Sequence, residues 1–190
     1  MGREFELKYR AEDAVLAAIA ETYGEFTPIS METTYYDTAD RALSRLRWTL
    51  RRRLENGVSV CTLKTPAPGG GRGEWEVESP ALEQAMDALC ALGAPEALKD
   101  LTSQGIQPVC GARFQRLAKT LALPECTVEL ALDRGRLLGG NQMLPFAEVE
   151  VEVKSGSEEA AVEFASHLAN RFGLIPEPAS KYKRALSLTL

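Results

Sequence analysis

Carboxylates and cationic side chains recur at every second position in several stretches of this sequence. The first stretch is Glu4-x-Glu6-x-Lys8, where Phe5 and Leu7 fill the alternate positions. Successive side chains of a β-strand point to opposite faces, so this spacing predicts a strand with one apolar face and one charged face. On the charged face, carboxylates could bind a divalent cation and an ammonium could bind an anion. Similar rows are Arg51 and Arg53, Glu74 and Glu76, Glu129 between Val128 and Leu130, and Glu148, Glu150 and Glu152 alternating with valines.

One strand of this kind would most simply present its charged face to solvent, as antiparallel sheets commonly do. Repetition of the pattern favours a second interpretation, in which the rows face one another across a closed barrel and line its lumen. Buried charges must be paired or bind a partner, because burial of a lone charge is costly. A metal-bound polyphosphate would satisfy both signs, since Arg and Lys bind phosphate oxygens and carboxylates hold Mg²⁺ or Mn²⁺. The solvated face remains the alternative at this point.

Composition excludes several other classes of function. The chain has 190 residues, of which 45% are hydrophobic and 26% charged, so we expect one globular domain over residues 1–190. No apolar run approaches the ~18 residues of a membrane span, so we expect a cytoplasmic protein without membrane contact. The net charge of −5 argues against nucleic-acid binding. Four scattered cysteines and one histidine, His167, offer little for a zinc site or for nucleophilic triads.

Most of the elements that must position the charged rows are strands. Asn56-Gly57 predicts a hairpin turn, Pro66–Gly71 a long hairpin connection, and Asp133-Arg134-Gly135 a further turn. We expect no linker that divides the chain, and residues 180–184 form a basic tail. The predicted strands cover residues 3–10, 27–36, 46–54, 58–64, 74–79, 109–121, 127–132 and 145–154, and the predicted helices cover 12–23, 80–92, 95–104 and 158–172.

Taken in order, the charged rows resemble the signature of the CYTH domain family, the triphosphate tunnel metalloenzymes. The ordered set is far more specific than any single motif, and it covers essentially the whole chain. The matching segments are Glu4-x-Glu6-x-Lys8, Tyr35-Tyr36-Asp37-Thr38, Leu50-Arg51-Arg52-Arg53, Thr62-Leu63-Lys64, Arg72-Gly73-Glu74-Trp75-Glu76, Phe114-Gln115-Arg116, the segment from Glu129 to Gly135, Glu148-Val149-Glu150-Val151-Glu152 and Ser180-Lys181.

This resemblance implies an α+β fold, a closed eight-stranded antiparallel β-tunnel with a charged lumen and helices packed outside. It implies that divalent ions, Mg²⁺ or Mn²⁺, are held by Glu4, Glu6, Glu148 and Glu150, with Glu129 grouped beside them on the acidic wall. Glu74, Glu76 and Glu129 could bind a second ion or position the attacking water, and Lys8 would orient the substrate. The residues implied to grip the triphosphate are Lys8, Arg51, Arg53, Lys64, Arg116 and Lys181.

Five further charged residues receive expectations of their own. Alternation directs Arg52 outward, and Glu152 ends its row as either a rim charge or a continuation of the wall. Asp133 is expected to shape the turn with Gly135, and Arg113 and Arg184 to face solvent.

The activity implied by the resemblance is metal-dependent hydrolysis of a small-molecule triphosphate, first of all inorganic tripolyphosphate to diphosphate and phosphate. The alternatives are a class IV adenylate cyclase, a thiamine or nucleoside triphosphatase, and a non-catalytic polyphosphate-binding module. A homodimer is compatible with the sequence.

Overall fold

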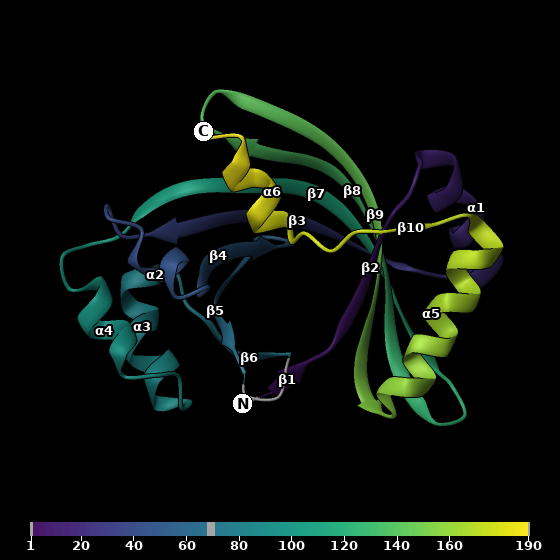
Figure 1. The fold of residues 1–190 in the computed structure, drawn as a ribbon, viewed down its shortest axis with the longest axis horizontal. Coiled ribbons are helices and arrows are strands. Elements are labelled where there is room, and N and C mark those ends of the chain that lie inside the picture. Colours follow the sequence, from purple (N-terminus) through teal and green to yellow (C-terminus); the bar gives the residue numbers. More distant parts are fainter. Residues whose placement is uncertain (1, 68–70, 190) are drawn as a thin grey trace.

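The computed structural model describes residues 2–67 and 71–189, so the middle of the expected connection Pro66–Gly71 lies outside the described residues. The described strands form one antiparallel sheet with the order β1-β6-β5-β4-β3-β7-β8-β9-β2-β10 (Figure 1). Their bounds are β1 (Gly2–Glu4), β2 (Glu6–Arg10), β3 (Thr27–Asp37), β4 (Thr49–Glu55), β5 (Val58–Pro66), β6 (Arg72–Glu78), β7 (Gln107–Ala122), β8 (Cys126–Gly139), β9 (Gln142–Gly156) and β10 (Ile175–Pro176).

The predicted α+β class is confirmed, but the closed eight-stranded tunnel is wrong. The sheet has ten strands, and because only Phe5 separates β1 from β2, these strands derive from nine passes of the chain. The order of pairing is open, since no ladder among the described residues joins β1 to β10. The N-terminal segment pairs through β1 with β6 and through β2 with β9. It therefore contributes a strand near each end of the strand order.

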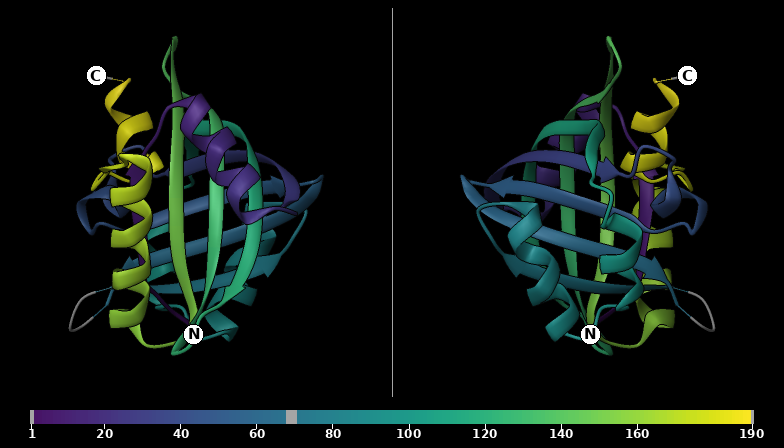
Figure 2. Two further views of the ribbon diagram at one scale, coloured as in Figure 1. Left: turned by 90° about the vertical axis from the view of Figure 1, so that its right-hand side faces the viewer. Right: turned by 90° about the vertical axis from the view of Figure 1, so that its left-hand side faces the viewer.

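Most of the helices cover the outer side of the curved sheet, and the C-terminal helix lies on its concave side (Figures 1 and 2). One group packs on β5 and β6, a second group packs on β8 and β9, and a short C-terminal helix lies on β7 and β8. None of the described helices is long and apolar enough to cross a membrane. In chain order the helices are α1 (Asp13–Tyr23), α2 (Ala42–Arg45), α3 (Leu82–Ala91), α4 (Ala97–Thr102), α5 (Glu158–Phe172) and α6 (Lys181–Ser187).

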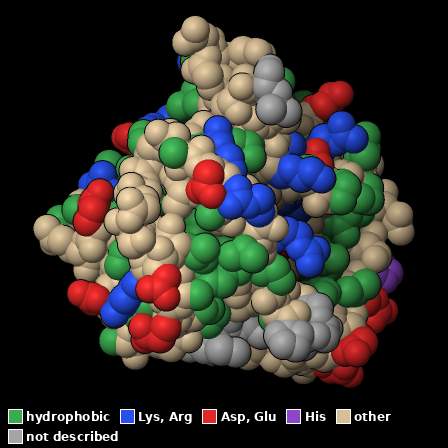
Figure 3. Space-filling model, turned by 60° about the vertical axis from the view of Figure 1, so that its left-hand side comes forward, with side chains coloured by type: hydrophobic (Ala, Val, Ile, Leu, Met, Phe, Trp, Pro, Cys, Tyr) green, Lys and Arg blue, Asp and Glu red, His purple; other side chains and the backbone are tan. Residues whose placement is uncertain are grey.

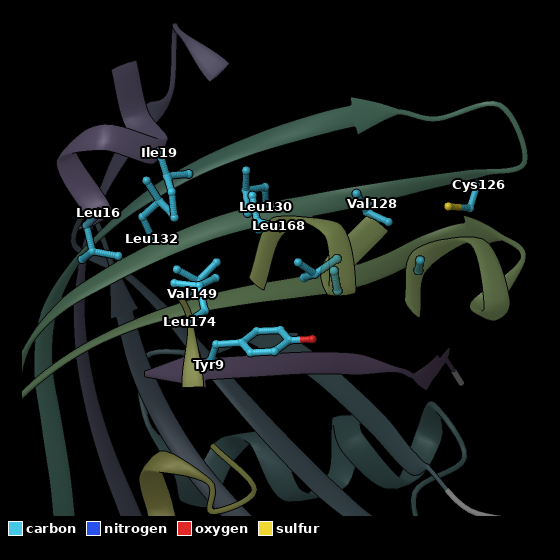
Figure 4. Close-up of a cluster of buried hydrophobic side chains, with 13 residues drawn as sticks. Tyr9, Leu16, Ile19, Cys126, Val128, Leu130, Leu132, Val149, Leu168 and Leu174 are labelled. Atoms are coloured by element: carbon cyan, nitrogen blue, oxygen red, sulfur yellow. The ribbon is translucent and has the colours of Figure 1, made fainter. Parts of the chain in front are cut away.

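The hydrophobic core lies between the sheet and these helices. Leu130 and Val149 are completely buried against Ile19 of α1 and Leu168 of α5 (Figure 4). A second cluster joins β4, β5 and β6 to α3 and α4. Because strand side chains alternate, packing the apolar face against helices turns the charged face of the same strands to the concave side. The burial of apolar surface therefore decides which way the charges point.

Local sequence signals account for several elements as predicted. Ser157 caps α5 by accepting a hydrogen bond from the Ala160 amide, and Gly173 ends that helix with a φ of 66°. The Asn56-Gly57 pair makes the β4–β5 turn with φ angles of 48° and 89°.

Other boundaries were predicted wrongly. Helix α2 was not predicted, and the strand expected from Leu46 begins at Thr49. The carboxylate of Asp37 accepts hydrogen bonds from the backbone amides of Leu43 and Ser44. The N-terminus of α2 is therefore capped by a residue that lies six and seven positions before these amides in the sequence, and not by the residue directly before the helix. Helix α6 also contains the basic residues 181–184, where no helix was predicted.

The turn predicted at Asp133-Arg134-Gly135 is wrong as well. Strand β8 runs through these residues to Gly139, and the connection to β9 follows at Gly140 and Asn141. Gly135 serves close strand packing instead of a turn, since a Cβ there would lie 2.1 Å from the Arg113 carbonyl oxygen and 2.4 Å from the Phe114 Cβ. Gly135 therefore allows β7 and β8 to approach closely.

We predict that Gly135→Ala lowers the free energy of unfolding by about 1–3 kcal/mol, because the added methyl group must push β7 and β8 apart. Urea unfolding followed by circular dichroism measures this change. Arg134→Ala is the matched control on the adjacent residue, whose side chain is 68% exposed, and we expect it to stay within about 0.5 kcal/mol. Equal midpoints for both variants would contradict the close packing at Gly135.

Candidate functional site

The concave side of the sheet holds a cavity of about 460 Å³ lined mainly by charged side chains. Lys and Arg side chains gather around a hollow on this side of the molecule (Figure 3). Every predicted site residue except Glu148 lines the cavity: Glu4, Glu6, Lys8, Arg51, Arg53, Lys64, Glu74, Glu76, Arg116, Glu129, Glu150 and Lys181. These residues come from β1, β2, β4, β5, β6, β7, β8, β9 and α6, so the curvature of the sheet brings them together.

One wall of the cavity is cationic. Arg51 and Arg53 alternate on β4, and their side chains are only 11% and 10% exposed. The Arg51 guanidinium lies 3.8 Å from Glu74, and Arg53 donates to the Thr33 hydroxyl at 3.1 Å. Burial lowers the pKa of Arg53, and the charges of Arg51 and Arg116 lower it further. This cationic wall would therefore be stabilised by an anion in the cavity.

A second group of charges encloses the ammonium of Lys181. Carboxylate oxygens of Asp133, Glu148 and Glu150 lie within 4.8 Å of one another. The Lys181 ammonium lies 2.7 Å from Asp133 and 2.8 Å from Glu150, and it also pairs with Glu148. Burial opposes the charge of Lys181, but the three carboxylates outweigh it and raise the lysine's pKa. This lysine therefore sits where a group of three carboxylates could otherwise hold a metal ion.

Two arginines complete the charge balance of this group. Arg116 binds Asp133 in a two-pronged arrangement, with distances of 2.8 and 2.7 Å, and also pairs with Glu150. Arg184 pairs with Glu148. The three carboxylates are thus matched by three cations, which is the condition under which buried charges are tolerated.

These contacts correct the expectations for Asp133 and Arg184, and they show where Glu148 and Glu152 lie. Asp133 does not shape a turn, because its fully buried carboxylate holds Arg116 and Lys181. Arg184 does not face solvent, since its side chain is 15% exposed. Glu148 is enclosed by Lys181 and Arg184 and does not line the cavity, whereas Glu152 does. Had the alternation from Glu129 been continued past residue 131, Asp133 would have been placed on the charged face.

Arg52 points away from the cavity, as the alternation of strand side chains predicts, and Arg113 is partly exposed to solvent. Arg52 donates to the Ser59 hydroxyl at 2.8 Å and does not line the cavity. The Arg113 side chain is 43% exposed and lies 3.4 Å from Glu32. Sequence reasoning gave no role to Arg72 or Lys154, which also line the cavity.

The opposite wall of the cavity is acidic. The β-sheet register places Glu129 opposite Glu152, and Glu152 opposite Glu6, so three neighbouring strands contribute a row of carboxylates. Lys8 is 3.8 Å from Glu6. Burial raises the pKa of Glu6 to about 7, and the nearby charges of Glu150 and Glu4 act in the same direction. Burial and the two neighbouring carboxylates therefore outweigh Lys8 and Lys64 and favour the protonated form of Glu6.

This acidic wall fits a divalent cation. Glu4, Glu6, Glu150 and Glu152 supply the carboxylate oxygens that Mg²⁺ and Mn²⁺ prefer. A cation next to Glu6 would offset the burial and the carboxylate repulsion that raise the pKa of Glu6.

We predict that Glu6→Gln stabilises the metal-free protein at pH 8 but not at pH 4.5. The folded protein retains the Glu6 proton up to about pH 7, whereas an unfolded carboxyl releases it near pH 4.5. Between these values the folded state binds more protons, so the contribution of Glu6 to stability falls as the pH rises. Thermal unfolding of both proteins in chelator at several pH values measures the difference. A difference that does not change with pH would contradict the raised pKa.

Comparison with known proteins gives the fold and site a family context. The chain is 27% identical to an inorganic triphosphatase from Haemophilus influenzae over 99% of its own length, and it spans 55% of the length of that curated relative. A protein from Hippeastrum provisionally classed as an adenylyl cyclase, whose structure reveals a dominant triphosphatase activity, is 17% identical with a TM-score of 0.67. The structural match covers 100% of this chain and 97% of the Hippeastrum chain.

A protein from Bacillus halodurans, provisionally named an adenylate cyclase, is 21% identical with a TM-score of 0.66 over 95% of this chain and 96% of its own. At these identities the two structures establish similarity of fold alone. The family model of the CYTH domain matches residues 2–186 of this chain. The chain therefore belongs to the CYTH domain family.

Proposed function

We propose that this protein hydrolyses inorganic tripolyphosphate to diphosphate and phosphate, with help from a divalent cation. The observation that carries the proposal is the pairing of a cationic wall with an acidic wall across one cavity of about 460 Å³. The name of the Haemophilus influenzae relative, inorganic triphosphatase, supports this choice of reaction. The match of the CYTH description to residues 2–186 supports treating the chain as one functional unit.

The cationic side chains would bind the phosphate oxygens. Arg51, Arg53 and Arg116 present guanidinium groups, whose planar forks suit phosphate, and Lys64 and Lys181 add ammonium charge. In the protein alone these cations pair with carboxylates, as Lys64 does with Glu4 and with Glu74 at 3.3 Å. Arg53 lies near other cations, which lower its pKa after burial. A bound anion would therefore favour the charged form of Arg53.

The acidic wall would hold the cation. Glu4, Glu6 and Glu150 are the candidate ligands given by the family resemblance, and Glu152 lines the cavity beside them. Glu148, the remaining ligand given by the resemblance, pairs with Lys181 and Arg184 beside the cavity and forms one group of three carboxylates with Asp133 and Glu150. A bound Mg²⁺ or Mn²⁺ would neutralise phosphate charge and polarise the phosphorus centre.

Glu74 and Glu76 are suited to positioning water. Burial would raise the pKa of Glu74, but Lys64 and Arg51 outweigh it, so the pKa falls and this carboxylate remains ionised. Glu76 accepts a hydrogen bond from Thr62 at 3.0 Å, and its side chain is 48% exposed. Either carboxylate could accept a hydrogen bond from a water molecule, while Lys8 orients the substrate from the neighbouring wall.

The same cavity could serve a related reaction on an organic triphosphate. Conversion of ATP to cyclic AMP, or hydrolysis of thiamine triphosphate or ATP, would need the same anion and cation contacts. Phosphate release from tripolyphosphate, ATP and thiamine triphosphate, alongside a cyclic AMP assay, distinguishes these reactions. A polyphosphate-binding module would bind tripolyphosphate and turn over none of them.

We predict that Arg53→Ala lowers kcat/KM for tripolyphosphate at least about 30-fold, because loss of a buried charged contact typically costs roughly 2–5 kcal/mol. Arg52→Ala is the matched control, since Arg52 adjoins Arg53 on β4 but bonds Ser59 outside the cavity. Its kcat/KM is expected to remain within about twofold of wild type. Similar losses in both variants would show that the cationic wall does not bind the substrate.

We predict that a chelator abolishes phosphate release and that Mg²⁺ or Mn²⁺ restores it. In Glu4→Gln, restoration should require a much higher ion concentration, because the acidic wall has lost a carboxylate ligand. Glu163→Gln, at an exposed position on α5, should respond to the ions as wild type does. Full activity in the chelator would contradict the assignment of the acidic wall to a cation.

A further inference from the structure

Tyr182 lines the cavity next to Lys181, but neither the charged rows nor the proposed reaction gives it a role. Its phenol oxygen lies 2.7 Å from the hydroxyl oxygen of Ser44 in helix α2, although the two residues are 138 positions apart in the sequence. The Ser44 hydroxyl also bonds the carboxylate of Asp37, the last residue of β3. These three side chains, which we call the tyrosine anchor, join helix α6 to α2 and to the end of β3.

The carboxylate fixes the direction of the hydrogen bonds in the tyrosine anchor. An ionised carboxylate can only accept, so the single hydroxyl hydrogen of Ser44 is donated to Asp37. The Ser44 oxygen must then accept the hydrogen of the Tyr182 phenol. Asp37 is completely buried, and the backbone amides of Leu43 and Ser44 donate to it at 3.0 and 3.1 Å. The tyrosine anchor therefore ends on a carboxylate that main-chain groups hold in place.

Adjacent residues of α6 contact different parts of the sheet. Lys181 reaches Asp133 on β8 at 2.7 Å and Glu150 on β9 at 2.8 Å. The ring of Tyr182 instead packs on Tyr35 of β3, with the ring centroids 5.0 Å apart. Helix α6 has only seven residues, and a helix this short is not stable without tertiary contacts. Its position therefore depends on contacts at both parts of the sheet.

We infer that Tyr182 is a positioning residue that acts through Lys181. The three carboxylates attract the Lys181 ammonium toward β8 and β9. The tyrosine anchor opposes this attraction, because it holds the first turn of α6 from the side of β3, which is paired with the strand of the cationic wall, β4. Lys181 thus stays between the two walls, where a phosphate oxygen can reach it. This inference rests on the phosphate-binding role that the proposed function gives to Lys181.

Binding of a non-hydrolysable imidotriphosphate in the presence of Mn²⁺, measured by titration calorimetry on the full chain, tests the inference. Tyr182→Phe removes only the phenol hydroxyl and should raise the dissociation constant about fivefold, the effect of one lost hydrogen bond. Ser44→Ala should raise it by a similar factor, whereas Ser44→Thr keeps the hydroxyl and should restore the affinity of wild type. Tyr23→Phe is the matched control and should bind as wild type does, since Tyr23 lies on α1 against Phe164, outside the cavity.

A double variant separates positioning from a general loss of packing. In Lys181→Met, which lacks the ammonium, the addition of Tyr182→Phe should not weaken binding further, because Tyr182 acts through the missing group. A further fivefold loss on that background would overturn the inference, and so would wild-type affinity in Tyr182→Phe alone.

The rate of lysine acetylation by an N-hydroxysuccinimide ester, followed by mass spectrometry, gives a readout that needs neither binding nor turnover. Lys181 and Lys64 are both largely buried, but Lys64 lies on β5 and not on α6. Tyr182→Phe should therefore accelerate acetylation of Lys181 and leave that of Lys64 unchanged. Equal rates at Lys181 in Tyr182→Phe and wild type would contradict the positioning role, even if Lys181→Met did not fold. Failure of the proposed function would look different, because wild type would not bind imidotriphosphate while the acetylation of Lys181 still differed.

Discussion

The need to neutralise buried charge is the constraint on which the rest of this structure depends. A carboxylate removed from water without a partner costs several kcal/mol, and breaking one member of a buried pair leaves that penalty uncompensated. Asp133 shows how the protein meets the constraint: its fully buried carboxylate contacts both Arg116 and Lys181. Lys181 begins helix α6, so the C-terminal helix is tied to the sheet by the same contacts that balance its charges.

Apolar packing explains why so much charge is collected on one side. Leu130 and Val149 pack against helices outside the sheet, which forces their neighbours Glu129 and Glu150 to the concave face. The sheet thus has most of its hydrophobic core on its outer side and most of its charged groups on its concave side. A smaller apolar cluster that includes Phe114, Leu137 and Ala185 packs α6 onto β7 and β8 on the concave side. Such a charged interior is stable only with matched signs, and around Glu6 burial and the neighbouring carboxylates disfavour the charged form. A divalent cation on the acidic wall and a polyanion on the cationic wall would each add compensating charge.

Much of this arrangement could be predicted from the sequence, because alternation is a local property. The rows at Glu4 and Glu6, at Arg51 and Arg53, and at Glu150 all reach the cavity as their spacing indicates. The resemblance to CYTH proteins added the expectation of one shared site. Helix α5 was equally predictable, since its cap Ser157 and its terminal Gly173 are adjacent to it in sequence.

The errors arose where the outcome depends on residues distant in sequence. Helix α2 is capped by Asp37 several residues away, and the pairing of β1 and β2 with different strands could not be inferred from the N-terminal segment alone. The two-residue alternation of strand side chains also could not show that Glu148 and Glu152 have different surroundings, because both lie on the same face of β9. Only the position of Lys181 and Arg184 shows which of the two carboxylates is enclosed.

We propose that the two charged walls form one binding site for a triphosphate and a cation. The most direct measurement is a crystal structure of the protein with a non-hydrolysable imidotriphosphate and Mn²⁺, in which anomalous scattering locates the ion. We expect phosphate density against Arg51, Arg53 and Arg116, with the ion beside Glu6. Phosphate density on the outer surface, or an ion remote from the acidic wall, would contradict it.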